Sequence, residues 1–367
     1  MIFSKAFRFF DWPLFLAVLL LALTGIMMIY STGIASEIES KLWVRQVITL
    51  LLGIFGLFFF SSIDYRYFNK IAGAVYLVAI FLLVAVFIFG QEIRGAVRWY
   101  DFGFFNFQPA EFSKLALIFL LARFFQKKQP VLKKFRYVLW SGFYLAVAVA
   151  LLMLQPDLGS AIIHATIWAG MLFVSATPRR FLFYVLVIFL ILSVFAWMFL
   201  LHDYQKDRIR SFTDPTTDPS GAGYNAIQSI VAVGSGGVFG TGLARGLQSQ
   251  LRFLPERQTD FIFASTVEEL GFIGGGIILL LFILLLQRLL KIIRDGRELF
   301  GVYLTSGIFF LFLSQILINI GMNLGLVPVT GVTLPLMSYG GSSLMITFWL
   351  IGIVQSVYRL TNSAKFV

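Results

Sequence analysis

The sequence predicts an all-α, polytopic integral membrane protein that forms a single transmembrane domain over residues 1–367. Of these residues, 59% are hydrophobic and 13% are charged, whereas a soluble domain averages about 25% charged residues. The mean hydropathy is +0.88. Apolar runs of transmembrane length recur from one end of the chain to the other. We find no internal repeat of fixed period.

Ten segments are apolar and long enough to cross a bilayer, for which a helix needs about 20 residues. They are 11–31, 44–63, 71–90, 108–125, 137–155, 158–176, 181–201, 261–287, 302–324 and 343–360. The first segment follows Lys5 and Arg8 and so resembles a signal peptide. Its apolar run from Trp12 to Tyr30 exceeds the roughly 7–15 residues of a signal-peptide core, so we expect a retained helix.

The positive charges predict the orientation of these helices. Lys and Arg concentrate in alternate connections, namely the N-terminus, 63–70, 123–136, 177–180, 288–297 and the C-terminal tail. These connections hold 18 of the 29 basic residues. Because basic connections stay in the cytoplasm, both termini are predicted to be cytoplasmic. The net charge of +11 therefore indicates membrane orientation and not a nucleic-acid partner.

The extracytoplasmic side carries the unusual polar segments. Residues 91–107 are too polar to span and rich in aromatic side chains, which predicts a segment at the membrane interface. Residues 202–259, between the seventh and eighth predicted helices, form the long extracytoplasmic loop. Loops of this length are usually functional or disordered. The Gly- and Pro-rich loop 325–342 lies on the same side.

Asp260 stands where the long loop meets the eighth predicted helix. A carboxylate at such a boundary can be held partly desolvated, which suits a general base. The plainer alternative is a helix cap, because an acidic residue in the first turn offsets the helix dipole. Taken alone, the residue favours the cap, since perturbed carboxylates also occur in purely structural networks.

Further ionisable residues lie toward the outer ends of predicted helices. Glu111 and Lys114 share one helix face, and their plainest role is an ion pair. Asp157 opens the sixth helix, where its plainest role is again a cap. Glu268 and Glu269 lie about 12 Å below the start of the eighth helix. Unpaired and lipid-facing, these charges would cost on the order of 10 kcal/mol, so we expect them to face a polar cavity open to the outside.

Several cations on the outer side run against the orientation bias. Arg45 begins the second helix, Arg98 lies in the interfacial segment, and Lys206 lies in the long loop. The same loop also carries Arg208, Arg210, Arg245, Arg252 and Arg257. Pairing with acidic residues of the loop accounts for more than half of them, since surface pairs are common and weak. The remainder would suit an anionic ligand such as a phosphate.

At this point the sequence resembles the SEDS family (shape, elongation, division and sporulation). The stretches that carry the resemblance are GAVRW at 95–99, FQPAEFSK at 107–114, QPDLGSA at 155–161, HDYQKDRI at 202–209, DPTTDPSGAGY at 214–224, QSIVAVGSGG at 228–237, QSQLRFLPERQTDFIFA at 248–264, EELGFIG at 268–274 and GLVPVTGVTLPLMSYGGSS at 325–343. They cover nearly the whole chain. Within the family, HDYQ and LPER favour the rod-shape branch over the division branch.

The resemblance implies a peptidoglycan glycosyltransferase that polymerises lipid II on the outer face of the cytoplasmic membrane. It also implies a complex with a class B penicillin-binding protein, the transpeptidase. Asp260 matches the essential aspartate of the family, and Arg98 matches its interfacial motif. Glu111, Lys114 and Asp157 match its cavity charges.

Two positions depart from the family pattern. Gln258 stands where His is usual before Thr-Asp, which puts in doubt any role of that His in tuning the aspartate. Thr241 stands where a basic residue is common, which removes one candidate phosphate contact.

The resulting hypothesis makes Asp260 the general base that takes the proton from the acceptor hydroxyl. The cations Lys114, Arg45, Arg98 and Lys206 would offset the charge of the leaving diphosphate, and Glu111 would hold Lys114 in place. A divalent cation, Mg²⁺ or Mn²⁺, could share that work. No dedicated ligand set is visible, since the chain has no Cys and only two His, and we read both His as structural.

Two alternatives remain at this stage. A lipid II flippase would also use charges in a polar cavity, with Glu268 and Glu269 as its candidates. The absence of an inverted repeat and the long outer loop favour chemistry at one face. A scaffold without activity fits the topology but leaves the charge cluster unexplained.

Overall fold

The computed structural model describes residues 9–34, 39–93, 96–103, 106–129, 132–199, 201–214, 218 and 221–363. Lys5, Arg8 and parts of the motifs at 95–99 and 214–224 lie outside the described residues. The described long helices are α2 (Trp12–Gly33), α3 (Leu42–Ser62), α4 (Arg66–Phe89), α5 (Pro109–Lys128), α6 (Phe135–Leu154), α7 (Leu158–Val174), α8 (Arg179–Phe199), α12 (Ile262–Asp295), α13 (Leu299–Asn323) and α14 (Gly341–Ser363).

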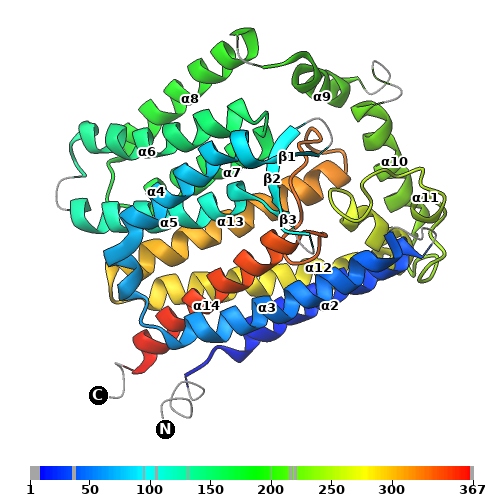
Figure 1. The fold of residues 1–367 in the computed structure, drawn as a ribbon, viewed down its shortest axis with the longest axis horizontal. Helices are drawn as coiled ribbons and strands as arrows, with labels where there is room; N and C mark the ends of the chain where they lie inside the picture. Colours follow the sequence, from blue (N-terminus) through cyan, green and yellow to red (C-terminus); the bar gives the residue numbers. More distant parts are fainter. Residues whose placement is uncertain are drawn as a thin grey trace.

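These helices follow the ten predicted spans (Figure 1). Eight of them in the described chain are long and apolar enough to cross a membrane by themselves. The other two are α5 and α7. The α5 helix carries Glu111, Lys114 and a basic C-terminal end, and α7 has only 17 residues. Both are packed inside the bundle, where protein contacts replace part of the lipid contact.

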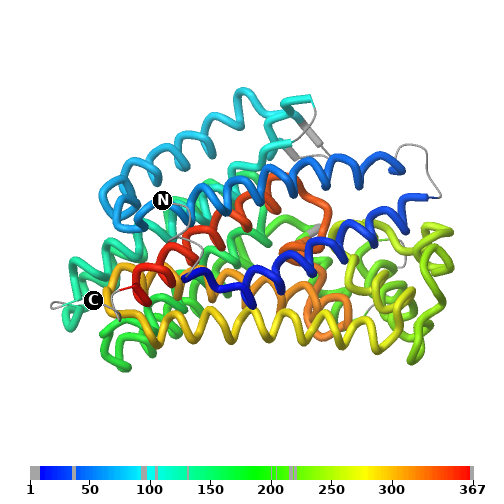
Figure 2. The backbone as a smooth tube through the Cα atoms, turned by 90° about the horizontal axis from the view of Figure 1, so that it is seen from below, coloured from blue at the N-terminus to red at the C-terminus, as the bar shows by residue number. Residues whose placement is uncertain are grey.

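The two ends of the bundle differ in character. The start of α2 and the end of α14 lie together, where the amide side chain of Gln355 pairs with both backbone groups of Asp11 at 2.8 and 2.9 Å. The outer loop lies at the opposite end of the molecule (Figures 1 and 2). It contains the short helices α9 (Asp203–Thr213), α10 (Ala222–Ser235) and α11 (Leu247–Gln250). The described parts of both chain ends are therefore on the side away from the loop.

The interfacial segment contains strands, which the sequence analysis did not predict. The strands β1 (Gln91–Ile93), β2 (Ala96–Asp101) and β3 (Asn106–Phe107) form a small antiparallel sheet in the order β1-β2-β3. The Tyr100 hydroxyl donates to the carbonyl of Leu82 at 2.9 Å, which ties the sheet to α4. Pairing its own backbone groups lets this polar segment rest at the outer end of the bundle.

The α12 helix is broken near its outer end. Gly271 has φ +70° and ψ −172°, a backbone conformation that only glycine adopts readily. The segment 236–242 folds against the break, where the N–H of Phe272 bonds to the carbonyl of Gly237 at 2.9 Å and the N–H of Thr241 to that of Glu268 at 3.0 Å. The loop thus replaces helical hydrogen bonds that the break removes, as non-helical backbone at membrane depth requires.

Substitution of Gly271 by Ala is expected to lower the stability of the protein by at least about 2 kcal/mol, since it adds both strain and a clash. A Cβ at this position would lie 2.3 Å from the backbone nitrogen of Gly240. The control is Gly276→Ala in the same helix, where a Cβ meets nothing within 4 Å. Thermal unfolding in detergent measures both variants. Equal melting temperatures would show that the loop does not hold the break in place.

Candidate active site

Asp260 ends the outer loop, and α12 begins two residues later at Ile262. The N-cap residue of this helix is Phe261, which has no capping side chain. The N–H of Ala264 in the first turn is bonded to Oδ1 of Asn323 at 2.9 Å. One N–H of the first turn of α12 is therefore capped from α13.

The side chains of Asp260 and Arg208 meet at Gly331. Gly331 has φ +75°. A Cβ atom added to this glycine would lie 3.6 Å from Oδ2 of Asp260 and 3.8 Å from Nη1 of Arg208. Arg208 belongs to α9, so the outer loop brings this cation back to the start of α12. Because Gly331 has no side chain, a carboxylate and a guanidinium border the same small space.

Lys206, and not Arg208, is the residue of α9 that the sequence predicts as a cation for the diphosphate. Residues two apart on a helix do not share a face, so α9 cannot present both side chains to Asp260. Within the described ranges, no side-chain hydrogen bond or ion pair joins Lys206 or Arg45 to another predicted site residue. Arg45 is exposed in the first turn of α3.

Glu111 and Lys114 form the predicted ion pair on α5. Nζ of Lys114 lies 2.6 Å from Oε1 of Glu111. The two residues are only 3% and 8% exposed, respectively. Pro109 occupies the first turn of the helix, where its missing N–H costs nothing. A lysine this deeply buried needs a partner, and Glu111 supplies one from a single helical turn away.

Asp157 is the N-cap of α7, as its plainest role predicted. Its carboxylate accepts from the N–H of Ser160 at 3.0 Å and from the hydroxyl of Ser160 at 2.8 Å. It also accepts from Nε2 of Gln108 at 3.4 Å, and Gln108 directly precedes α5. Asp157 is 8% exposed. Asp157, which was predicted as a site residue, is therefore at the same time the N-cap of α7.

A second bridge joins α5 to α7 below Asp157. His164 is fully buried, with Nδ1 2.7 Å from the carbonyl of Ser160 and Nε2 2.8 Å from the hydroxyl of Ser113. Ser113 is the residue before Lys114. His164 is thus structural, as predicted, and it fixes the two helix ends that carry Asp157 and the Glu111–Lys114 pair.

Arg98 supports Asp157 through the backbone. Its guanidinium donates to the carbonyls of Gln155 and Pro156 at 2.7 and 2.6 Å. These are the two residues before Asp157, so Arg98 holds the turn that leads into α7. This arrangement makes Arg98 a support for the site as well as a cation beside it.

The segment Thr330–Val332 connects the two groups of charges. On one side a Cβ at Gly159, in the first turn of α7, would lie 3.0 Å from the carbonyl of Thr330. On the other side Gly331 faces Asp260 and Arg208. Among the described contacts, Asp260 has no direct bond to Lys114 or Asp157. The first turn of α7 and the Asp260–Arg208 pair therefore both contact this one segment of the loop between α13 and α14.

Glu268 and Glu269 do not line an open cavity, and this expectation was wrong. They are 0% and 1% exposed. Glu268 accepts from the N–H of Gln248 at 2.7 Å and the hydroxyl of Ser249 at 2.6 Å, and Glu269 accepts from the hydroxyl of Ser31. The outer loop folds down onto both carboxylates, and linear sequence cannot reveal such a return.

The side chains of the two residues that depart from the family pattern bond to groups other than Asp260. Gln258 directs Nε2 to Glu39 at 3.3 Å, beside Arg257, which bonds to the same carboxylate. Burial lowers the pKa of the Arg257 guanidinium, which Glu39 opposes. The Thr241 hydroxyl donates to the carbonyl of Glu268 at 3.0 Å. Both residues brace the loop.

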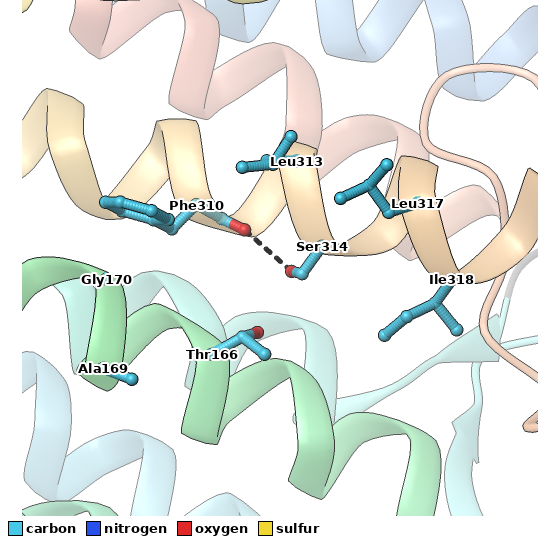
Figure 3. A pocket seen from close by; sticks show the side chains of 8 residues that line it. All are labelled: Thr166, Ala169, Gly170, Phe310, Leu313, Ser314, Leu317 and Ile318. Atoms are coloured by element: carbon cyan, nitrogen blue, oxygen red, sulfur yellow. Dashed lines mark hydrogen bonds between the residues drawn. The ribbon is translucent and has the colours of Figure 1, made fainter. Parts of the chain in front are cut away.

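No group of three His, Cys, Asp or Glu in the described part of the chain is arranged to hold a metal ion. Two hollows do occur. A polar one of about 530 Å³ is lined by Asp207, Arg208, Arg210, Ser211, Asp218, Gly221 and Ala222. An apolar one of about 350 Å³ lies between α7 and α13, lined by Thr166, Ala169, Gly170, Phe310, Leu313, Ser314, Leu317 and Ile318 (Figure 3).

The chemistry of the linings separates these hollows. In the apolar one, the Ser314 hydroxyl donates to the carbonyl of Phe310 at 2.7 Å, so the walls offer little to a sugar or a diphosphate (Figure 3). The polar hollow includes Arg208, which also borders Asp260. Of these two hollows, the polar one therefore shares a residue with the surroundings of Asp260.

Comparison with known proteins identifies the family of this chain. A sequence profile of the Cell cycle protein family, which covers FtsW, RodA and SpoVE, matches residues 11–363. The chain belongs to this family. It is 39% identical to the peptidoglycan glycosyltransferase MrdB of Escherichia coli K12 over 350 residues, which cover 95% of this chain and 93% of MrdB. It is also 38% identical to stage V sporulation protein E of Bacillus subtilis over 364 residues, 96% and 98% of the two chains.

The fold matches a solved structure as well. A chain of a peptidoglycan synthase complex that coordinates polymerization and crosslinking has a TM-score of 0.81 and 33% identity, covering 96% of this chain and 98% of that chain. The protein is a multi-pass peptidoglycan glycosyltransferase of the cytoplasmic membrane, and its predicted fold class is confirmed. The similar identities to MrdB and to the sporulation protein do not distinguish the branches of the family.

Substitution of Lys114 by Met is expected to destabilise the protein by about 3–5 kcal/mol, because it leaves the Glu111 carboxylate buried without a partner. The double variant Glu111→Gln/Lys114→Met should recover most of this loss. Thermal unfolding in detergent measures both.

The matched control breaks the Arg210–Asp207 pair, which has the same spacing but side chains 60% and 48% exposed. Arg210→Met should cost less than about 1 kcal/mol. If Lys114→Met behaves like Arg210→Met, the Glu111–Lys114 pair is hydrated in solution and the buried cluster described here does not exist.

Proposed function

We propose that this protein polymerises lipid II on the extracytoplasmic side of the cytoplasmic membrane, with Asp260 as the catalytic base. The supporting observation is the pair of side chains, Asp260 and Arg208, that border the space beside Gly331. A base and a fixed cation next to one opening are what a transfer with an anionic leaving group requires. Both sit at the outer end of α12, where the sugars of a membrane-anchored substrate lie.

In the proposed reaction, Asp260 takes the proton of the acceptor's 4-hydroxyl. The freed oxygen attacks the anomeric carbon of the donor, and a new carbon–oxygen bond forms. The bond from that carbon to the phosphate oxygen breaks, and undecaprenyl diphosphate leaves with the electron pair. Attack opposite the α-linked leaving group inverts the centre, so the product is a β-1,4 linkage.

We assign the cations of the outer end to the diphosphate. Arg208 borders the space beside Gly331 together with Asp260, and Lys114 is held by Glu111 on α5. Arg45 and Lys206 are further candidates on the outer side. Arg98 holds the turn before α7, and Asp157 caps that helix. A divalent cation could add to this charge, and the reaction above does not depend on one.

The motifs HDYQ and LPER lead us to propose the elongation branch, that is, a RodA-type polymerase for cell elongation and rod shape. For such an enzyme the partner would be a class B penicillin-binding protein. The similarity to a chain of a peptidoglycan synthase complex supports a partner of this kind. A polymerase placed beside its transpeptidase can pass new glycan directly to crosslinking.

The flippase alternative loses its main support. Its candidate residues, Glu268 and Glu269, are bonded to the outer loop and line no described passage. Ionisable residues of a transporter face the substrate pathway. The outer loop binds these two carboxylates instead, which indicates a structural role.

Asp260→Asn is expected to reduce polymerisation of labelled lipid II by about 10²–10⁴-fold, the usual contribution of a general base. Purified protein in vesicles, with and without a cognate transpeptidase, provides the assay. Asp101→Asn is the control, because Asp101 is an exposed carboxylate of the outer sheet that accepts from the N–H of Gly103. Normal glycan synthesis by folded Asp260→Asn protein would refute the base assignment, and flipping without polymer would favour the transporter.

The branch assignment predicts the result of complementation. The gene should restore rod shape to cells depleted of their elongation polymerase and should not rescue cells depleted of their division polymerase. The Asp260→Asn variant, produced at equal level, is the control for activity. Rescue of division alone would place the protein in the other branch.

A further inference from the structure

Two buried asparagines of α13 surround the main chain of Asp260. Asn319 and Asn323 lie four residues apart on one helix face, and each is 0% exposed. An amide inside an apolar bundle is costly unless it is hydrogen-bonded. Nδ2 of each asparagine donates to the carbonyl oxygen of Asp260 at 2.9 Å. One backbone oxygen therefore receives two side-chain donors from a neighbouring helix.

Asn323 also fixes the first turn of α12. Its Oδ1 accepts from the N–H of Ala264 at 2.9 Å, and the helix has no capping side chain at Phe261. The first N–H groups of a helix lack partners within the helix. Asn323 supplies one such partner from a neighbouring helix. The direction in which α12 leaves Asp260 is therefore set by α13.

Asn319 joins Asp260 to the loop that contains Gly331. Its Nδ2 is shared between the carbonyls of Asp260 and Val332, at 2.9 and 2.8 Å. Val332 follows Gly331, the residue that faces Asp260 and Arg208. A single amide therefore fixes the spacing between the segment that carries the base and the loop that borders the space in front of it.

The outer loop reaches the same pair of residues. The hydroxyl of Ser229 on α10 donates to the carbonyl of Asn323 at 2.9 Å. Three parts of the chain far apart in sequence, α10, the start of α12 and the loop after α13, are thus joined at the outer end of α13.

We propose that Asn319 and Asn323 are positioning residues for the transfer reaction. They hold the backbone of Asp260 so that its carboxylate faces Gly331 and Arg208 at the distance the acceptor hydroxyl requires. They do not touch the reacting atoms themselves. The proposal rests on the proposed role of Asp260 as the base.

The test is the variant Asn319→Leu, which keeps a similar volume and removes the amide. Since a misplacement of about 1 Å can cost roughly 10²-fold in rate, kcat for lipid II polymerisation should fall by about 10–100-fold. KM should stay within about twofold, because the cations that bind the diphosphate are untouched. Rates are normalised to folded, monodisperse protein.

The matched control is Ser306→Ala on the same helix, since Ser306 is also 0% exposed and bonds only within α13, to the carbonyl of Val302 at 2.8 Å. Its kcat and KM should remain those of the unmodified protein. Asn323→Asp is the second variant, because it removes the amide donors and keeps an oxygen for the N–H of Ala264. Its kcat per folded protein should fall in the same way, and its melting temperature should fall as well, because the new carboxylate would be buried against the carbonyls of Asp260 and Asn319.

Three results would overturn the proposal. These are an unchanged kcat in both asparagine variants, a rise in KM that accounts for the whole loss, or an equal loss in Ser306→Ala. Asp260→Asn is run in parallel. If Asp260→Asn is inactive while both asparagine variants are normal, only the positioning role fails. If Asp260→Asn is active, the proposed base fails with it.

Discussion

A polar group inside the bilayer region needs a partner within the chain, because lipid offers none, and among the described residues exceptions such as Thr305 and Trp349 are few. The strongest example is the outer part of α12, where Gly271 breaks the helix. The loop segment 236–242 supplies the missing backbone bonds, and the carboxylates of Glu268 and Glu269 bind the backbone of the residues that follow. The break, the loop and the two carboxylates are thus joined by hydrogen bonds and stabilise one another.

The same rule organises the site. Lys114 is buried with Glu111, Asp157 is satisfied by Ser160, and the carbonyl of Asp260 is bonded to two asparagines. The space beside Gly331 is bordered by the side chain of Asp260, whose backbone is held in this way. Side chains that are held by hydrogen bonds within the protein keep their orientation when a charged substrate binds.

Much of the fold could be predicted from the sequence, because the length of an apolar run directly reflects the thickness of a bilayer. The Glu111–Lys114 pair could be predicted too, since it depends only on helical spacing. Arg208 was missed because the face that α9 presents depends on tertiary packing. Glu268 and Glu269 were misread because their partners come from a loop that folds back onto them. The signal for Asn319 and Asn323 was present, as two amides four residues apart in an apolar helix.

The α8 helix differs from these buried elements, because it makes few contacts with the rest of the described chain. All of its 21 residues are described, and Phe181 alone is buried. Almost its whole surface is therefore free of contact with the rest of the described chain, and packing within the chain contributes little to its preferred tilt. A change in hydrocarbon thickness would move this helix first and leave the α12–α13 pair in place. The lipid composition of the host membrane thus acts on the protein at one particular helix.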